Sequence, residues 1–176
     1  MDNYGTHQKV LFKAVSFTQK NVIEFGAGDF STEQLHELCR DRLLVTVEDN
    51  SEWLGKYIHL RDDHHLLVDS LIDDDYWGVV FIDNGTWEAR LEMIDKYMMK
   101  TDYMVVHDTE AMFDWSIVGP AAAAKFKNIT DWGVYFKWFA EFRDISGGPC
   151  TIIGSNFIDI TNLEIDGMQR IYRNNS

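Results

Sequence analysis

The sequence has few cysteines, few positive charges and no long apolar run, and each shortage excludes a class of protein. Cys39 and Cys150 lie far apart and form no C-x-x-C pair, so neither a disulfide framework nor a cysteine zinc cluster is indicated. Isolated cysteines fit a reducing compartment. No apolar run reaches membrane-spanning length, and the amino terminus lacks the apolar region of a secretory signal. A cytoplasmic protein is therefore expected.

The net charge further limits the classes of binding partner that we expect. The formal net charge is −13 at pH 7. Nucleic-acid phosphates require lysine and arginine contacts, and an acidic surface disfavours anionic membranes, so we expect neither partner. The 176 residues favour one domain spanning 1–176, and 45% hydrophobic content is ample for a packed core. A homo-oligomer is compatible with these features.

A glycine-rich turn follows the first apolar strand within residues 22–32. Gly26 and Gly28 can adopt positive φ and allow a ligand to approach the main chain closely. Ser31 is a good N-cap for the next helix, and Gln34 completes a capping-box pattern. The helix start offers unpaired N–H groups, so this segment predicts a nucleotide-type cofactor site.

An acid at the end of the second strand supports that interpretation. Glu48 lies twenty residues after Gly28, where a carboxylate can accept hydrogen bonds from both ribose hydroxyls. Ser31 stands at the third small position of a dinucleotide fingerprint, after the bulky Phe30. This departure favours a ligand with a carboxylate and a sulfonium over one with a pyrophosphate.

Strands alternate with helices along most of the chain, which predicts a three-layer α/β fold with a mostly parallel sheet. The expected strands are 21–25, 43–48, 57–60, 78–83 and 103–108, and the expected helices are 6–19, 31–40, 51–56, 63–72 and 87–99. Residues 132–139 and 150–157 are expected to pair antiparallel at the carboxyl-terminal edge, and Pro120 to start another helix. Ligands of such sheets lie at the carboxyl ends of the strands. The acids at or near these ends are Glu24, Glu48, Asp83 and Asp108.

Four motifs in this order resemble the Rossmann-like S-adenosylmethionine-dependent methyltransferases, in particular the catechol-type and macrocin-like sugar O-methyltransferases. They are E-F-G-A-G (24–28), V-E-D (47–49), V-V-F-I-D-N-G (79–85) and V-V-H-D-T (105–109). The resemblance covers roughly residues 6–157. It implies that Glu24, Gly26, Gly28 and Ser31 surround the methionine part of the cofactor, that Glu48 holds the ribose, and that Asp62 or Asp63, after the third strand, lies near the adenine.

The resemblance also implies a divalent-metal option, with Mg²⁺ or another cation between Asp83 and Asp108. Two residues are candidates for the third ligand: Thr109 by comparison with the catechol-type enzymes, and His107 by comparison with the macrocin-like enzymes. Magnesium prefers oxygen ligands and often keeps water, so two acids, water and substrate hydroxyls are compatible with it. Residues 84–86 lack a histidine that many relatives carry there.

Methyl transfer to a hydroxyl also requires removal of the acceptor proton. His107 is the favoured base if it is not a metal ligand, because its ordinary pKa lies near neutrality. His64 and His65 are alternatives, although solvated loop positions are the simpler expectation for them. The competing interpretation of Asp83 is a helix cap, and that of His107 a buried core histidine. Four tryptophans could line an acceptor pocket, with at least half of them expected in the core: Trp87, Trp115, Trp132 and Trp138.

These features together predict a methyltransferase that acts on a hydroxyl of a small acceptor, with a sugar or glycan as the first expectation. Two alternatives stay open. One is a nicotinamide-dependent oxidoreductase on a similar sheet, against which the missing third glycine counts. The other is a non-catalytic cofactor-binding module, suggested by the incomplete metal set and the missing histidine.

Overall fold

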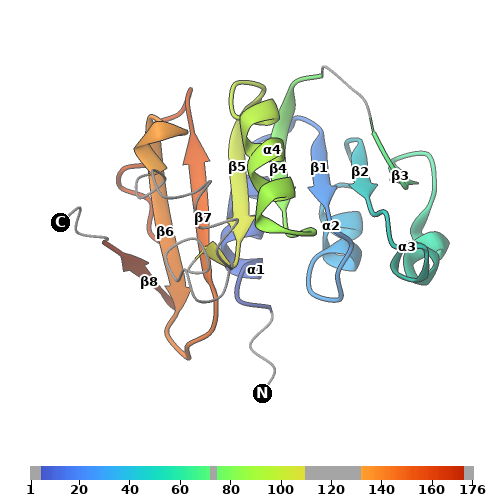
Figure 1. Cartoon of the computed structure of the whole chain (residues 1–176), viewed down its shortest axis with the longest axis horizontal. Helices are drawn as coiled ribbons and strands as arrows, with labels where there is room; N and C mark the ends of the chain where they lie inside the picture. The colour runs from blue at the N-terminus through green and yellow to red at the C-terminus, as the bar shows by residue number, and fades with distance from the viewer. Residues whose placement is uncertain (1–4, 72–74, 110–131, 173–176) are drawn as a thin grey trace.

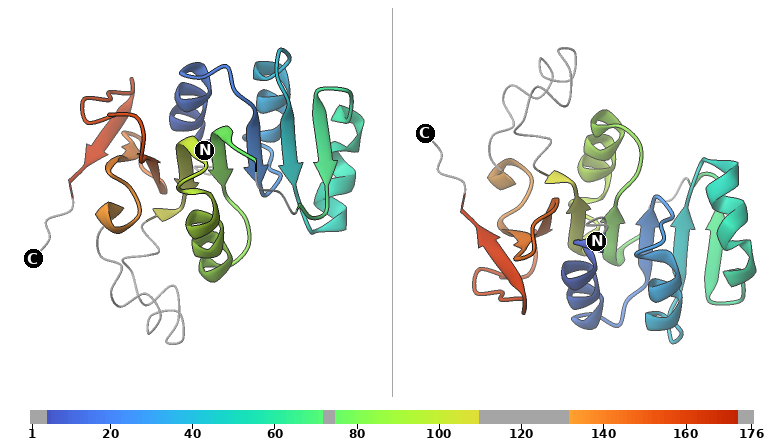
Figure 2. Two further views of the ribbon diagram at one scale, coloured as in Figure 1. Left: turned by 90° about the horizontal axis from the view of Figure 1, so that it is seen from above. Right: turned by 90° about the horizontal axis from the view of Figure 1, so that it is seen from below.

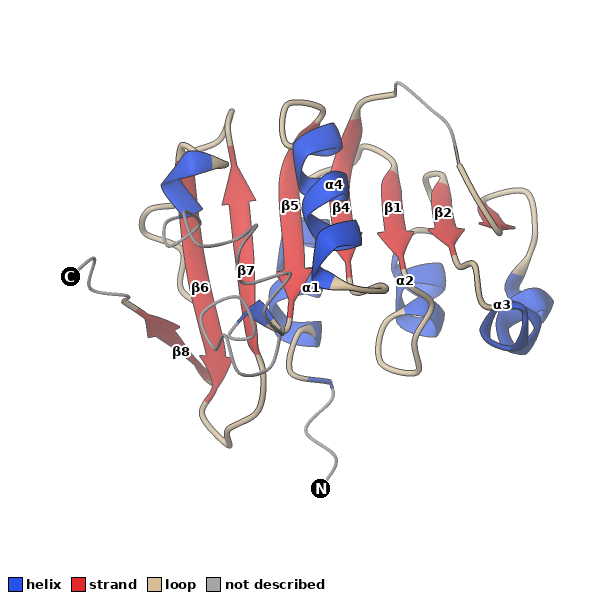
Figure 3. Ribbon diagram, viewed as in Figure 1, coloured by secondary structure: helices blue, strands red, loops and turns tan. Residues whose placement is uncertain are grey.

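The computed structural model describes residues 5–71, 75–109 and 132–172, which form one eight-stranded sheet with helices on both faces (Figure 1). The strand order is β3-β2-β1-β4-β5-β7-β6-β8. Figure 3 distinguishes the helices from the strands. The elements are α1 (Gln8–Ser16), β1 (Val22–Phe25), α2 (Thr32–Leu38), β2 (Leu44–Val47), α3 (Ser51–Tyr57), the 3₁₀ helix η2 (Ile58–Leu60), β3 (His65–Val68), β4 (Trp77–Ile82), α4 (Trp87–Tyr97), β5 (Thr101–His107), the 3₁₀ helix η4 (Trp132–Val134), β6 (Trp138–Asp144), β7 (Cys150–Ser155) and β8 (Met168–Ile171).

The sheet divides into a parallel and an antiparallel part. Strands β3, β2, β1, β4 and β5 run parallel, whereas β7, β6 and β8 pair antiparallel beyond β5. The predicted α/β fold with an antiparallel carboxyl-terminal edge is confirmed. The sequence patterns did not predict β8, which has only four residues. No helix in the described part of the chain is long and apolar enough to cross a membrane.

Two apolar layers hold the helices to the sheet. Figure 2 shows α1 and α2 on one face and α4 on the other. Along β4, Val79 and Phe81 join the layer under α1 and α2, while Val80 and Ile82 join the layer under α4. This alternation follows from the two-residue period of a strand. Helix α1 buries the apolar side chains whose spacing predicted it: Val10, Leu11, Ala14 and Val15.

The third strand lies later in the chain than the sequence patterns predicted. Residues 57–60, expected as a strand, end α3 and form η2, and residues 63–72, expected as a helix, contain β3. The short apolar run from Leu66 to Val68 is ambiguous by periodicity, and pairing with β2 decides it. The predicted strand over 132–139 is also corrected, because it is η4 followed by the start of β6. The helix expected at Pro120 falls outside the described residues.

Candidate functional site

The carboxyl ends of the parallel strands form one rim that carries polar groups. Just after β2 and β4, backbone hydrogen bonds to the neighbouring strand continue for one more residue. The Glu48 amide donates to the Val68 carbonyl at 3.0 Å, and the Asp83 amide donates to the Phe25 carbonyl at 2.9 Å. Both acids are therefore at the same edge of the sheet, as the alternation of strands and helices predicted.

The two glycines of the turn have different reasons to be glycine. Gly26 has a φ of 95°, and a Cβ there would lie 2.7 Å from the Asp83 carbonyl oxygen. It is required for the close approach of the β1 and β4 loops. At Gly28 an added Cβ would meet only the Ser31 hydroxyl, at 3.5 Å. A side chain at Gly28 would therefore make an ordinary contact with the protein and no clash, so the fold itself does not require glycine there.

The helix start after the turn does not form the predicted capping box. Ser31 is the N-cap of α2, but its side chain makes no capping hydrogen bond. Instead, the Gly28 amide donates to the Thr32 hydroxyl at 2.9 Å, which pins the turn to the first residue of the helix. The Ser31 hydroxyl acts on Glu24, whose pKa it helps to lower. The sequence pattern identified the correct N-cap residue but not the role of its side chain.

Glu24 is fully buried under the turn and has an unusual protonation equilibrium. Burial raises the pKa of its carboxyl to about 7, and the Ser31, Thr46 and Thr32 hydroxyls only partly oppose that rise. The Thr46 hydroxyl donates to Glu24 Oε2 at 2.8 Å. Among the described residues, the buried Oε1 atom has no hydrogen-bond partner. A buried carboxylate oxygen without a hydrogen-bond partner needs an explanation, and a cationic group of a ligand that reached it would supply one.

Glu48 closes the turn from the neighbouring strand. Its Oε2 accepts from the Ala27 amide at 2.9 Å and its Oε1 from the Asn50 amide at 2.7 Å. These bonds fix the carboxylate, and each oxygen still has a lone pair for a second donor. The unpartnered oxygen of Glu24, a Gly28 that the fold itself does not require and the fixed Glu48 together are compatible with the cofactor that the family resemblance implies.

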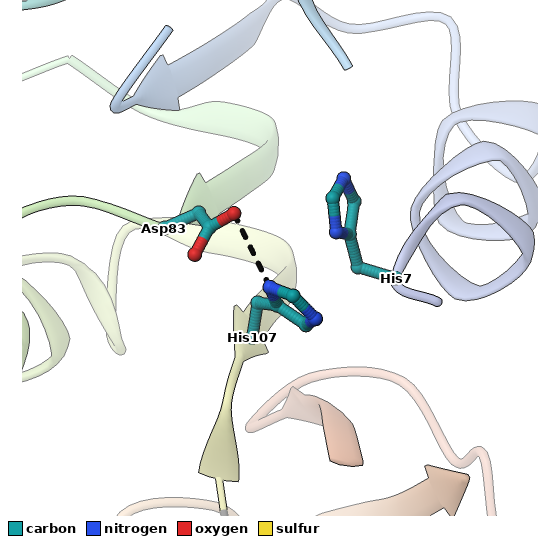
Figure 4. Close-up of side chains that lie close together, drawn as sticks. All are labelled: His7, Asp83 and His107. Atoms are coloured by element: carbon teal, nitrogen blue, oxygen red, sulfur yellow. Dashed lines mark hydrogen bonds and ion pairs between the residues drawn. The ribbon is translucent and has the colours of Figure 1, made fainter. Parts of the chain in front are cut away.

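A second group of polar side chains lies at the ends of β4 and β5. His107 Nδ1 is 3.2 Å from Asp83 Oδ2, and the His7 ring approaches from the start of α1, as Figure 4 shows. Ligating atoms of these three residues lie within 4.8 Å of one another. His107 Nε2 is 3.2 Å from the Thr6 hydroxyl oxygen. The sequence predicted Asp83 and His107 together but not His7, whose position depends on how α1 packs.

Arg90 binds this group from the opposite face and was not predicted. Its guanidinium lies 3.3 Å from Asp83 Oδ1 and 3.7 Å from Asp108 Oδ2, and it donates to the His107 carbonyl at 2.7 Å. Burial acts to raise the pKa of Asp83, but His107 and Arg90 hold it below its ordinary value. Asp83 does not cap the following helix, because the Thr86 hydroxyl does so. Asp83 is therefore ionised near neutral pH.

The donor atoms at this rim do not fit the predicted magnesium site of Asp83, Asp108 and Thr109. The buried Thr109 hydroxyl donates to Glu141 at 2.5 Å. Asp108 has a φ of 58° and shares the positive charge of Arg90 with Asp83. The group that converges on Asp83 is instead two imidazoles. Mg²⁺ prefers an all-oxygen shell, and a dication beside Arg90 would meet like charge.

The corrected position of β3 changes the adenine assignment. Asp62 and Asp63 precede β3, so they lie at the opposite edge of the sheet from Glu48, and their predicted place near the adenine is wrong. The acid that follows β3 is Asp69. His65 is not in a solvated loop, since it is fully buried within β3.

The tryptophans divide between core and surface. Trp132 is buried against Tyr135 and Phe136, and Trp138 packs at the edge of the α1 layer. Trp87 lies beside the site, with its ring 5.1 Å from the Arg90 guanidinium carbon. Trp115 falls outside the described residues.

A separate hollow of about 600 Å³ lies beside Phe17 and Tyr103, near the start of β5, and none of the rim residues lines it.

A parallel sheet of this order, with a glycine turn after β1 and helices on both faces, defines the Rossmann-like methyltransferase fold, and solved structures share it. An O-methyltransferase from Bacillus cereus in complex with SAH is similar with a TM-score of 0.62 and 11% identity over 88% of this chain and 81% of that chain. The O-methyltransferase TomG from Streptomyces achromogenes in complex with SAM has a TM-score of 0.58 and 14% identity over 84% and 78%.

The N-methyltransferase NodS from Bradyrhizobium japonicum has a TM-score of 0.54 and 14% identity over 84% of this chain and 91% of that chain. At such identities the similarity establishes the fold, and the fold serves more than one acceptor chemistry. No protein-family model and no curated protein matches this sequence significantly.

Proposed function

We propose that the protein is an S-adenosylmethionine-dependent methyltransferase that acts on a hydroxyl group of a small acceptor. One observation carries the proposal: Glu24, the glycine turn and Glu48 lie on the same rim of the sheet as an Asp83–His107 pair. The first arrangement fits the methyl donor and the second can take a proton. Two structural neighbours are described in complex with SAM or SAH, which supports this choice of donor.

On the donor side, each residue has a distinct task. The ionised form of Glu24 would attract the positive end of the methionine moiety, and Gly28 would let the main chain contact it. Glu48 would accept the ribose hydroxyls. Asp69, which follows β3, would lie near the adenine in place of Asp62 or Asp63. The donor supplies a sulfonium methyl group, and these residues orient it toward the acceptor.

On the acceptor side, His107 would serve as the general base. Asp83 accepts from Nδ1–H, so a neutral His107 would have its lone pair on Nε2 and could take a proton there. The Thr6 hydroxyl donates its proton to the Pro149 carbonyl at 3.1 Å, so its oxygen, 3.2 Å from Nε2, accepts from Nε2–H. Before His107 acts as a base, Nε2 would have to release that proton and the acceptor hydroxyl would have to take the place of Thr6. When the acceptor oxygen bonds to the donor's methyl carbon and the carbon–sulfur bond breaks, His107 Nε2 would take the hydroxyl proton. Asp83 stabilises the resulting imidazolium.

This proposal needs no metal ion, because His107 would take the acceptor proton; Arg90 offsets part of the negative charge of Asp83 and Asp108. A sugar hydroxyl is the first acceptor to test. The half-buried Trp87 ring beside Arg90 offers an apolar face of the kind that sugar rings stack against. Because Trp87 starts α4, it would contact the acceptor rather than the donor.

Calorimetry and turnover assays test the proposal together. We expect S-adenosylhomocysteine to bind and NAD not to bind, and labelled methyl to pass from the donor to at least one member of a panel of sugars and catechols. EDTA should not reduce this turnover. Binding of NAD alone would favour an oxidoreductase. Binding of S-adenosylhomocysteine without turnover on any acceptor would favour a non-catalytic module.

A further inference from the structure

A second group of histidine and carboxylate side chains lies at the opposite edge of the sheet. His36 comes from α2, and Asp62 and His64 come from the connection between η2 and β3. Ligating atoms of the three residues lie within 4.8 Å of one another. His64 Nδ1 is 2.7 Å from Asp62 Oδ1, and the centroids of the His36 and His64 rings are 4.6 Å apart.

Backbone groups orient two members of this cluster. The amides of His64 and His65 both donate to Asp62 Oδ1 at 2.9 Å, which fixes the carboxylate. His64 Nε2 is 3.2 Å from the His36 carbonyl oxygen and must donate to it. Nδ1 is then the ring atom that a neutral His64 offers to a cation. Partners of this kind orient the ligands of metal sites.

A chain of hydrogen bonds from the sheet interior orients His36, the third residue of the cluster. The Thr46 hydroxyl gives its single proton to Glu24, so its oxygen accepts from His65 Nε2–H at 2.9 Å. A neutral His65 then offers its Nδ1 lone pair to His36 Nδ1–H, 3.2 Å away. His36 is thereby left with an unprotonated Nε2, the atom available for a metal.

We propose that His36, Asp62 and His64 bind a divalent cation of the zinc type. Two imidazoles and one carboxylate are a donor set that Zn²⁺ accepts, with water in the fourth position. In a tetrahedral zinc site neighbouring ligand atoms are about 3.3 Å apart, so small side-chain rotations complete the geometry. Within the described residues, no lysine or arginine forms an ion pair with Asp62. The bound ion would tie α2 to the connection before β3, the edge strand.

Calorimetric titration of the metal-free full chain with ZnCl₂ tests this site. We expect one ion per chain with micromolar or tighter affinity. His64→Gln and Asp62→Asn should each weaken binding more than about tenfold. His59→Gln is the matched control, because His59 lies on η2 nearby and outside the cluster. Asp83→Asn controls for the other histidine–carboxylate group and should leave zinc binding unchanged.

Thermal unfolding gives a second readout that does not depend on enzyme activity. ZnCl₂ should raise the melting temperature of the wild type by several degrees and that of His64→Gln hardly at all. His36→Gln provides an independent variant if His64→Gln folds poorly. The proposal is overturned if the wild type gives no heat with zinc, if His64→Gln and Asp62→Asn bind as tightly as the wild type, or if Asp83→Asn is the variant that loses the ion.

Discussion

Two groups of the same composition, two histidines and one aspartate, lie at opposite edges of one sheet and differ in their surroundings. In the rim group, the side chains of His107 and Asp83 are 4% and 24% exposed, and Arg90 lies against Asp83. In the His36 group, the side chains of His64 and Asp62 are 21% and 45% exposed, and the carboxylate is held by backbone amides.

The difference shows that residue types alone do not decide what such a group does. In the rim group, His107 and the fixed positive charge of Arg90 hold the pKa of Asp83 below its ordinary value against the effect of burial. The rim group is thereby suited to holding and moving a proton. Among the described residues, no lysine or arginine forms an ion pair with the His36 group, and His64 and Asp62 are partly exposed, which suits the proposed metal ion.

The largest expected effect comes from removing the carboxylate of the rim group. Asp83→Asn should lower kcat by at least about 100-fold, because general-base catalysis contributes on that scale. The dissociation constant for S-adenosylhomocysteine should change by less than about threefold, since Asp83 contacts the acceptor side. Steady-state kinetics and calorimetry on one preparation measure both.

Asp62→Asn, the matching change in the His36 group, should leave kcat unchanged. Equal losses of kcat in both variants would contradict the different roles of the two groups.

Substitutions at the two glycines of the turn should have different effects: one on the stability of the fold and the other on donor binding. Gly26→Ala should lower the free energy of unfolding by about 1–3 kcal/mol, because φ is positive and the Cβ would meet the Asp83 carbonyl. Gly28→Ala should hardly change stability but weaken S-adenosylhomocysteine binding about tenfold, a loss of about 1.4 kcal/mol. Chemical denaturation and calorimetry test the pair. Unchanged donor affinity in Gly28→Ala would place the donor elsewhere.

Glu24 gives the fold a pH dependence that neither histidine group explains. The pKa of its carboxyl is about 7 in the folded protein against 4.5 ordinarily, so the folded state holds this proton more tightly. Its contribution to stability is therefore complete below pH 4.5 and is lost as pH rises through about 7. Denaturation curves of the wild type should show a decline over this window that is absent in Glu24→Gln. Parallel curves for the two proteins would contradict the raised pKa.

The smallest expected effect concerns Thr46, which joins the hydrogen-bond chain from the His36 group to Glu24. The Thr46 hydroxyl stabilises the ionised carboxyl, so Thr46→Val should raise the pKa of Glu24 above its wild-type value of about 7. NMR titration of the Glu24 carboxyl carbon measures this shift. Thr46→Ser, which keeps the hydroxyl, is the control and should titrate like the wild type.

The parallel half of the fold was predictable because strong local signals repeat there. Apolar strands ending in Glu48, Asp83 and His107-Asp108 placed these residues at one rim without knowledge of the packing. The third strand was mislocated, since the short run at 65–68 has no helical or strand period of its own and gains its structure by pairing with β2. Asp62 and Asp63 were misassigned as a direct consequence.

The parts of the site that sequence patterns missed all depend on tertiary packing. His7 reaches the rim only because α1 crosses the sheet beside β4 and β5, and Arg90 reaches it from α4. A histidine before a helix and an arginine within one carry no local signal of such a role. The sequence patterns also missed the hydrogen bond from Thr109 to Glu141, because Glu141 comes from β6, which is distant in sequence.

The most direct test of the central claim is a crystal structure of the protein soaked with S-adenosylhomocysteine. We expect the ligand along the rim, with its ribose hydroxyls on Glu48, its amino acid moiety against Gly28 and Glu24, and its sulfur directed toward Asp83 and His107. Density for the ligand in the hollow beside Phe17 and Tyr103, or a rim that stays empty at saturating concentration, would contradict the proposed methyl-donor site.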